Sequence, residues 1–174
     1  MRHHLPFGPE RVAVVSLTRS GVVQAGRVIA VLPGAWLFAP EKFRAEAEAA
    51  APGTATCFAG KTADQIPMLF ARFDGIVAIV ALGIVVRLIA PYLRDKAHDP
   101  GIVVLDEGGR FAIPVLSGHI GGANALAALL AEQIGATPVF TTASDSRGTL
   151  AVDLLGREFG WRIEAPKDNV TRAS

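Results

Sequence analysis

The stretch Ile76-Val77-Ala78-Ile79-Val80 decides the fold class of this chain. The run is continuously apolar and mostly β-branched, and it follows the turn signal Asp74-Gly75. Such a run is typical of a strand that is buried on both faces of a sheet. A strand of this kind needs a layer of helices on each side, so the stretch predicts the centre of an α/β sheet.

Segments on both sides of this stretch repeat the alternation of strand and helix. Short apolar runs predict strands at residues 12–17, 36–38, 102–106 and 138–142, and helical spacing or composition predicts helices at 22–32, 41–51, 64–73, 83–93, 121–134 and 149–159. Helix 41–51 has little apolar face, so we expect it on the surface or loosely held. The alternation predicts a mostly parallel sheet with helices on both faces, a Rossmann-like three-layer α/β fold.

One β-hairpin interrupts this parallel pattern. Glu107-Gly108-Gly109-Arg110 has the composition of a hairpin turn, and residues 111–113 are expected to return antiparallel to strand 102–106. The chain has 174 residues, which suggests one domain. We assign residues 1–160 to an α/β domain and residues 161–174 to a tail or to the start of a middle segment or linker.

Composition excludes several classes of protein. Hydrophobic residues make up 51% and charged residues 19%, which is too apolar for a disordered chain. The net charge of +1 provides no basic field for nucleic acid. The single cysteine, Cys57, excludes a disulfide framework and a thiolate metal cluster. The longest uncharged apolar run, residues 76–86, is shorter than the roughly 20 residues of a membrane span. We therefore expect a cytoplasmic protein without membrane or nucleic-acid partners.

The fold rule for open α/β sheets points to the candidate site. Ligands of such sheets bind outside the carboxyl ends of the strands. The rule selects the loops after residues 17, 80, 106, 113 and 142, and we expect all of them at one edge of the sheet.

The densest polar cluster follows the hairpin and precedes helix 121–134. Glycines let a ligand approach the backbone, a helix start favours anions, and histidine changes charge within the physiological range. The cluster lacks the Gly-Lys-Ser/Thr of a phosphate loop, the dinucleotide fingerprint Gly-x-Gly-x-x-Gly and a nucleophile elbow. The alternative is a tight turn in which polar side chains satisfy the backbone. The candidate residues are Ser117, Gly118, His119, Gly121, Gly122 and Asn124.

Further candidates lie at the other predicted strand ends. Arg87 closes an apolar segment and could point back to the strand ends, or it could simply extend into solvent. Lys96 is a loop cation that could equally be solvated. Thr141, Thr142 and Asp145 could orient a polar ligand, whereas capping of the next helix is the alternative for Asp145. The acidic pair Asp106-Glu107 has an ordinary hairpin turn as its alternative. No metal-ligand spacing occurs.

These motifs together resemble the CbiG family. The resemblance rests on residues 83–87, Asp99-Pro100, residues 103–107, 116–124 and 141–145, and it extends over residues 12–160. The stretch Ser-Gly-His-x-Gly-Gly-Ala-Asn at residues 117–124 is its most specific part. The chain departs from the family at Ser144, where the family has threonine.

The resemblance implies a reaction in cobalamin (vitamin B12) biosynthesis. CbiG proteins are cobalt-precorrin-5A hydrolases, which open the ring A δ-lactone and release acetaldehyde to give cobalt-precorrin-5B. The chemistry of this reaction suggests His119 as general base, with Ser117 and Asp145 as further catalytic residues. The expected substrate contacts are Arg87, Lys96, Gly118, Gly121, Gly122, Asn124, Thr141 and Thr142, with the N–H groups of Gly121 and Gly122 facing an oxyanion. The substrate carries its own cobalt, so we expect no separate metal or cofactor.

Two other functions are kept as alternatives. Family members continue into a middle segment and a C-terminal domain, so this region could be a corrinoid-binding module that needs a separate C-terminal-domain polypeptide, with His119 as axial ligand to cobalt. A second alternative is an unrelated nucleotide-binding domain. A homodimer is also considered, because the Ala- and Leu-rich helix 121–134 could pack against a second copy.

Overall fold

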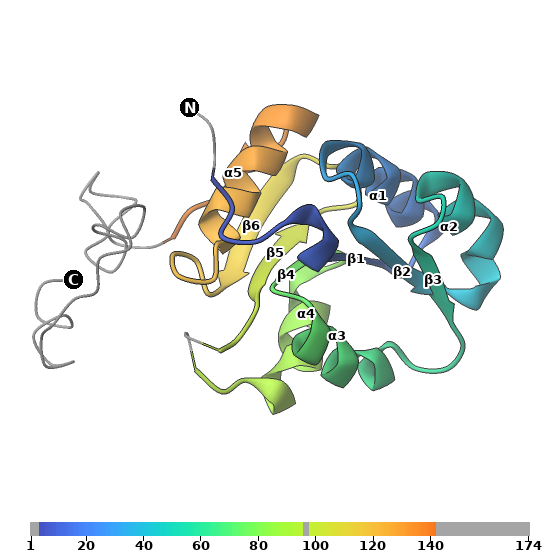
Figure 1. The fold of residues 1–174 in the computed structure, drawn as a ribbon, viewed down its shortest axis with the longest axis horizontal. Helices are drawn as coiled ribbons and strands as arrows, with labels where there is room; N and C mark the ends of the chain where they lie inside the picture. The colour runs from blue at the N-terminus through green and yellow to red at the C-terminus, as the bar shows by residue number, and fades with distance from the viewer. Residues whose placement is uncertain (1–3, 96–97, 142–174) are drawn as a thin grey trace, which may run out of the picture. The chain divides into compact units, whose positions relative to one another are not determined.

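The computed structural model describes residues 4–95 and 98–141, and Figure 1 shows their arrangement. The chain divides into two compact units, residues 1–139 and 140–174, and the fold below is that of the first unit. Its sheet has the strand order β3-β2-β1-β4-β5-β6-β7. The strands are β1 Val12–Ser16, β2 Trp36–Pro40, β3 Ala55–Phe58, β4 Gly75–Ile79, β5 Gly101–Leu105, β6 Phe111–Leu116 and β7 Thr137–Pro138.

The predicted central strand is confirmed. β4 is parallel to β1 on one side and to β5 on the other, with Val77 level with Val14 and with Val103. Every residue of β4 is buried, as a strand covered on both faces must be. β1 to β5 are all parallel, and β6 turns back antiparallel to β5 through the predicted hairpin.

Helices cover both faces of the sheet, so the predicted three-layer α/β fold is confirmed (Figure 1). Alternate residues of a strand point to opposite faces, and this separates two cores. Val14 packs in the core under α1, α2 and α5, whereas Val15 packs in the core under α3 and α4. The helices are α1 Arg19–Val31, α2 Arg44–Ala50, α3 Ile66–Arg72, α4 Leu82–Ile89 and α5 Ala123–Ile134, with short 3-10 turns at Pro9–Arg11, Glu41–Phe43, Thr62–Gln65 and Ala90–Tyr92.

Some elements differ from their predictions. The sequence analysis missed β3, an edge strand of four residues of which only Phe58 is buried, so it lacks an apolar run. Of the predicted strand 138–142, only Pro138 belongs to a strand, β7, and residue 142 lies outside the described residues. Residues 41–51 form a 3-10 turn and α2, which is held against the core by buried Ala47 and Ala51. The predicted helix 149–159 and the tail 161–174 lie outside the described residues.

The sheet places the candidate loops at two edges rather than one. β1, β4 and β5 end at what we call the carboxyl edge, and β6 ends at the opposite, amino edge because it is antiparallel to them. Gly101 begins β5, and a Cβ atom added to it would overlap the carbonyl oxygen of Gly121. The loop after β6 therefore lies beside the start of β5. The expectation that all ligand loops share one edge is wrong.

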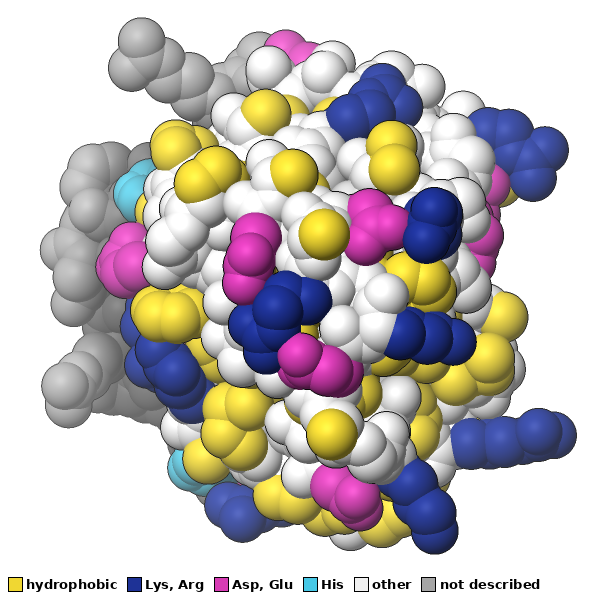
Figure 2. All heavy atoms as spheres, turned by 90° about the vertical axis from the view of Figure 1, so that its right-hand side faces the viewer, with side chains coloured by type: hydrophobic (Ala, Val, Ile, Leu, Met, Phe, Trp, Pro, Cys, Tyr) yellow, Lys and Arg dark blue, Asp and Glu magenta, His cyan; other side chains and the backbone are white. Residues whose placement is uncertain are grey.

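Charges of both signs mix on the side of the molecule that carries α2 and β3. Figure 2 views that side and shows acidic and basic side chains next to one another between apolar ones. Arg44 forms two of the ion pairs at α2. Its Nε lies 2.7 Å from Glu41 Oε1, and its Nη1 lies 3.1 Å from Glu48 Oε1. Within the described ranges, no helix is long and apolar enough to cross a membrane.

Candidate functional site

The loop 117–122 between β6 and α5 is built around its glycines. A Cβ atom on Gly121 would lie 2.8 Å from the carbonyl oxygen of Ser117, and one on Gly118 would lie 2.7 Å from Oδ1 of Asn124. Gly122 has φ 77°, a left-handed conformation that side chains other than glycine rarely adopt. Close contacts or backbone conformation therefore favour glycine at all three positions, as the tight-turn interpretation requires.

The first N–H groups of α5 are already bonded within this loop. Gly122 N–H donates to the carbonyl of His119 at 3.1 Å, and Ala123 N–H to that of Ser117 at 3.3 Å. Asn124 N–H donates to the carbonyl of Gly118 at 2.9 Å. The expectation that the Gly122 N–H faces an oxyanion is therefore corrected, because that hydrogen is used to close the turn.

Ser117 is the strained residue of the loop. Its φ is 53°, and it is the one residue other than glycine with positive φ in the described part of the chain. Its hydroxyl is buried and has no hydrogen-bond partner among the described residues. A left-handed non-glycine residue and an unsatisfied buried hydroxyl each cost about 1–3 kcal/mol. Such costs cluster at functional sites.

His119 and Asn124 complete the group that the loop brings together. His119 is half-buried, so its imidazole is not sealed in the interior, and it takes part in an interaction within the molecule. Asn124 is also half-buried, in the first turn of α5, and its amide lies against Gly118. A hydroxyl, an imidazole and an amide thus share one turn at the amino edge of the sheet.

The remaining predicted site residues lie outside the loop 117–122 in sequence. Arg87 is exposed on α4 and has no ion-pair partner among the described residues. Thr141 is exposed and belongs to the second unit. Lys96, Thr142 and Asp145 lie outside the described residues.

A second polar cluster lies at the carboxyl edge. Glu107 accepts hydrogen bonds from the hydroxyls of Thr18 at 2.8 Å and Ser20 at 2.5 Å. The Ser20 hydroxyl, followed by that of Thr18, lowers the pKa of the Glu107 carboxyl. This carboxylate sits at the start of α1, where a Rossmann-like fold would hold a phosphate. The protein's own anion there argues against the nucleotide-binding alternative.

The sequence analysis treated Glu107 as part of an ordinary hairpin turn. The turn itself depends on Asp106, whose Oδ1 accepts the N–H groups of Arg110 at 2.6 Å and Phe111 at 2.8 Å. Glu107 takes no part in these turn bonds, and its carboxylate extends past the end of β4 to Thr18 and Ser20 at the start of α1. Its partners are 87 and 89 residues away in sequence, so only the strand order could have revealed the contact.

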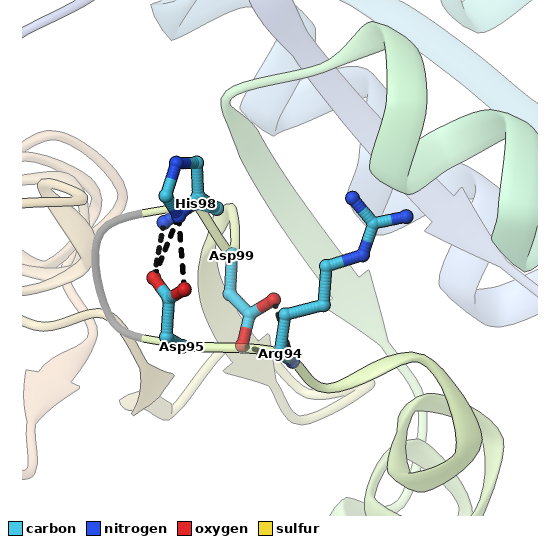
Figure 3. A network of polar contacts seen from close by, with 4 residues as sticks. All are labelled: Arg94, Asp95, His98 and Asp99. Carbon is cyan, nitrogen blue, oxygen red and sulfur yellow. Dashed lines mark hydrogen bonds and ion pairs between the residues drawn. The ribbon is translucent and has the colours of Figure 1, made fainter.

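The segment before β5 carries a third polar network, which Figure 3 shows. His98 Nδ1 lies 2.8 Å from Asp95 Oδ1, and buried Asp99 accepts the Arg94 N–H with both oxygens at 3.1 Å. The guanidinium of Arg94 points away from these carboxylates. A hollow of about 300 Å³ is lined by Arg94, His98 and Asp99 together with apolar residues of α3 and of the turn after α4.

No cluster that could hold a metal ion occurs among the residues that the structure describes. A metal site needs at least three suitable side chains, and no such group of histidine, cysteine, aspartate and glutamate is found there. His98 is bonded to Asp95 through Nδ1, and His119 takes part in an interaction within the molecule.

Comparison with known proteins identifies relatives over most of the chain. A cobalt-precorrin-5A hydrolase of Priestia megaterium is 42% identical over 162 residues, which are 93% of this chain and 42% of the relative. The enzyme of the same name from Salmonella typhimurium is 41% identical over 155 residues, 89% of this chain and 42% of that protein. The chain thus spans less than half the length of these relatives.

A solved structure shows the same fold. The crystal structure of a cobalamin biosynthesis protein G homolog from Sulfolobus solfataricus matches 99% of this chain and 46% of its own chain, with a TM-score of 0.55 and 23% sequence identity. The family described as "Cobalamin synthesis G N-terminal" matches residues 64–145, a range that includes Arg87 and the whole loop 117–122. Together with the two hydrolases that align with some nine-tenths of its residues, this match shows that the chain is similar to the CbiG family in the region that the family description calls N-terminal.

Proposed function

We propose that this chain acts in cobalamin biosynthesis in the hydrolysis of cobalt-precorrin-5A. The reaction opens the ring A δ-lactone and releases acetaldehyde, which leaves cobalt-precorrin-5B. Two hydrolases named for this substrate are 41% and 42% identical to the chain, and both alignments cover about nine-tenths of it. We also propose that the protein acts in the cytoplasm. Residues 1–160 would form its α/β domain, and residues 161–174 a linker.

The observation that carries the proposal is the turn that holds Ser117, His119 and Asn124. Lactone opening needs a base that takes a proton from water and donors for the oxygen that becomes negative. His119 is the half-exposed base of the turn, and the unpartnered hydroxyl of Ser117 is a ready donor. Asp145 would orient the imidazole.

The proton transfers follow from this arrangement. Water attacks the lactone carbonyl and gives a proton to His119, the carbon–oxygen bond of the ring breaks, and the imidazolium returns the proton to the freed oxygen. The resulting hydroxyl then loses its proton to the same imidazole, a carbon–carbon bond breaks, and acetaldehyde leaves while the electron pair stays on the macrocycle. The proposed substrate contacts are Gly118, Gly121, Asn124, Arg87, Lys96, Thr141 and Thr142, and the cobalt belongs to the substrate.

Acetaldehyde release by His119→Ala tests the role of the imidazole. Removal of a general base typically costs 10²–10⁴-fold in rate, so turnover of cobalt-precorrin-5A should fall by about that factor. His98→Ala is the matched control, because His98 is an exposed loop histidine bonded to Asp95 and should leave the rate within about twofold. Equal rates for the two variants would remove His119 from the mechanism.

The length of the relatives favours a second candidate, a binding module. The chain spans 42% of each hydrolase, so residues needed for turnover could belong to the remainder. A spectral titration with cobalt-precorrin-5A separates the two functions. A change in the cobalt ligand field without acetaldehyde release by this chain would identify binding as its own contribution.

A further inference from the structure

The outward face of α4 is apolar where a surface helix is normally polar. Leu82, Ile84 and Val86 are 41%, 45% and 47% exposed, whereas Val85 and Ile89 of the same helix are buried in the core. A helix at the surface of a globular protein usually turns charged residues to solvent. α4 has one charged residue, Arg87, and Leu93 extends the apolar surface beyond the helix with 46% exposure. We call Leu82, Gly83, Ile84, Val86, Arg87 and Leu93 the α4 face.

Gly83 adds a second feature to this face. It is exposed, no atom lies within 4 Å of an added Cβ, and its φ is not positive, so neither packing nor backbone geometry requires glycine there. Glycine weakens a helix, and it is useful where another surface approaches the backbone closely. Gly83 and Arg87 are one helical turn apart, so they lie on the same side of α4.

The length of the relatives indicates what covers this face. The chain corresponds to 42% of each aligned hydrolase, and the family description calls this region N-terminal. Most of the additional sequence of the relatives therefore follows it. An apolar face on a region that the relatives carry within a longer protein is the expected mark of a contact between parts of that protein.

We propose that the α4 face is the docking surface for the part of the hydrolase that follows this region in the longer relatives. That part would contribute apolar side chains around Gly83 and a carboxylate opposite Arg87. Arg87 lacks an ion-pair partner among the described residues, so a carboxylate from outside would complete it. This inference rests on the similarity to these hydrolases, and it gives Arg87 to the contact in place of the substrate role proposed above.

The charge of Arg87 argues against a second copy of the chain as the occupant. In a two-fold contact between α4 faces, each Arg87 would be placed in an apolar interface without a carboxylate from the other α4, because Arg87 is the one charged residue of this helix. A small ligand is also a poor occupant, because ligand sites are concave and a single helix face is convex.

Photolabelling with a small diazirine tests the proposal on unmodified proteins. The reagent is activated with this chain and, separately, with the full-length Priestia megaterium hydrolase, and labelled peptides are counted by mass spectrometry. Labelling of residues 82–93 in this chain should exceed that of the aligned helix in the hydrolase by about fivefold or more, since interface cores exclude solvent. The α1 peptide with Val23, an apolar side chain 66% exposed here, is the reference and should label equally in both proteins.

Cysteine reactivity provides a second measurement. Ile84→Cys and Val23→Cys are placed in a Cys57→Ser background, and the aligned positions of the hydrolase are changed in the same way. Maleimide should react slowly only at the position aligned with Ile84. Equal reactivity at both positions in both proteins would overturn the proposal. A dimer of this chain in sedimentation velocity that Val86→Asp dissociates would also overturn it, because the occupant would then be a second copy.

Discussion

Gly121 and Gly83 show how differently two glycines can be constrained in one fold. A methyl group on Gly121 would press on the Cβ and carbonyl oxygen of Ser117, which is already held at φ 53°. A methyl group on Gly83 meets no atom within 4 Å. The first glycine is required by the turn, and the second is not required by anything in this unit.

We therefore expect opposite effects of alanine at the two positions. Gly121→Ala should lower the free energy of unfolding by about 1–3 kcal/mol, the usual cost of overpacking. Gly83→Ala should raise it by about 0.4–1 kcal/mol, because alanine restricts the unfolded chain and fits the helix. Urea unfolding of both variants measures the two changes. A stabilising Gly121→Ala would mean that the turn 117–122 adapts to a side chain at this position, and a destabilising Gly83→Ala would mean that glycine is needed in α4.

Motif spacing predicted the members of this turn but not their conformations. His119 and its glycines stand out because a polar, glycine-rich stretch interrupts an apolar sequence. The left-handed conformation of Ser117 has no sequence signal, because serine rarely adopts it and it follows from the closure of the turn onto Gly121. The hydrogen bond from the Gly122 N–H to the His119 carbonyl could not be predicted either, because it also follows from the closure of the turn.

One carboxylate connects the hairpin between β5 and β6 to the start of α1 by hydrogen bonds. Glu107 accepts the hydroxyls of Thr18 and Ser20, and these two bonds cross the end of β4. The Ser20 and Thr18 hydroxyls bond the ionised form and so lower the pKa of Glu107 in the folded protein. A carboxyl whose pKa is lower in the folded state stabilises the fold above its unfolded pKa.

We expect this contribution to disappear in acid. The free energy of unfolding should fall as the pH drops through the unfolded pKa of a glutamate, about 4.3, and on through the lower pKa of Glu107 in the folded protein. Glu107→Gln should lower stability at pH 7 and flatten this part of the pH profile, and Ser20→Ala should do so in part. Urea midpoints between pH 3 and 7 measure the profiles. A profile of Glu107→Gln parallel to that of the wild type would show that the contact adds no stability.

Most strands were predicted from the apolar run that burial leaves in the sequence, and β6 was predicted from the hairpin turn before it. β1, β4 and β5 are buried along their length and were found, with boundaries within one or two residues. β3 pairs only with β2 and has Thr56 and Cys57 half-buried, so its sequence does not differ from that of a loop. An edge strand depends on its neighbour rather than on its own composition.

The reversal of β6 divides the candidate residues between two edges of the sheet. The hairpin turn was predicted correctly, but its consequence for the loop after β6 was not. The rule that places ligands at the carboxyl ends of strands was derived for parallel strands. Because β6 is antiparallel to β5, its carboxyl end lies at the amino edge of the sheet. His119 and Asn124 thus lie at the amino edge, and Ser20 and Glu107 lie at the carboxyl edge.

A titration with cobalt-precorrin-5A decides which edge holds the substrate. If the substrate binds at the amino edge, Asn124→Ala should raise its Kd about tenfold, the effect of about 1.4 kcal/mol, which is in the range of one hydrogen bond to a charged group. Ser20→Ala should leave the Kd unchanged, because its hydroxyl bonds Glu107 at the far edge of the sheet. Thermal melting of both variants checks that the Asn124 amide, which also packs on Gly118, is not needed for folding. Weaker binding by Ser20→Ala alone would move the substrate to the carboxyl edge and leave the turn 117–122 as a structural feature only.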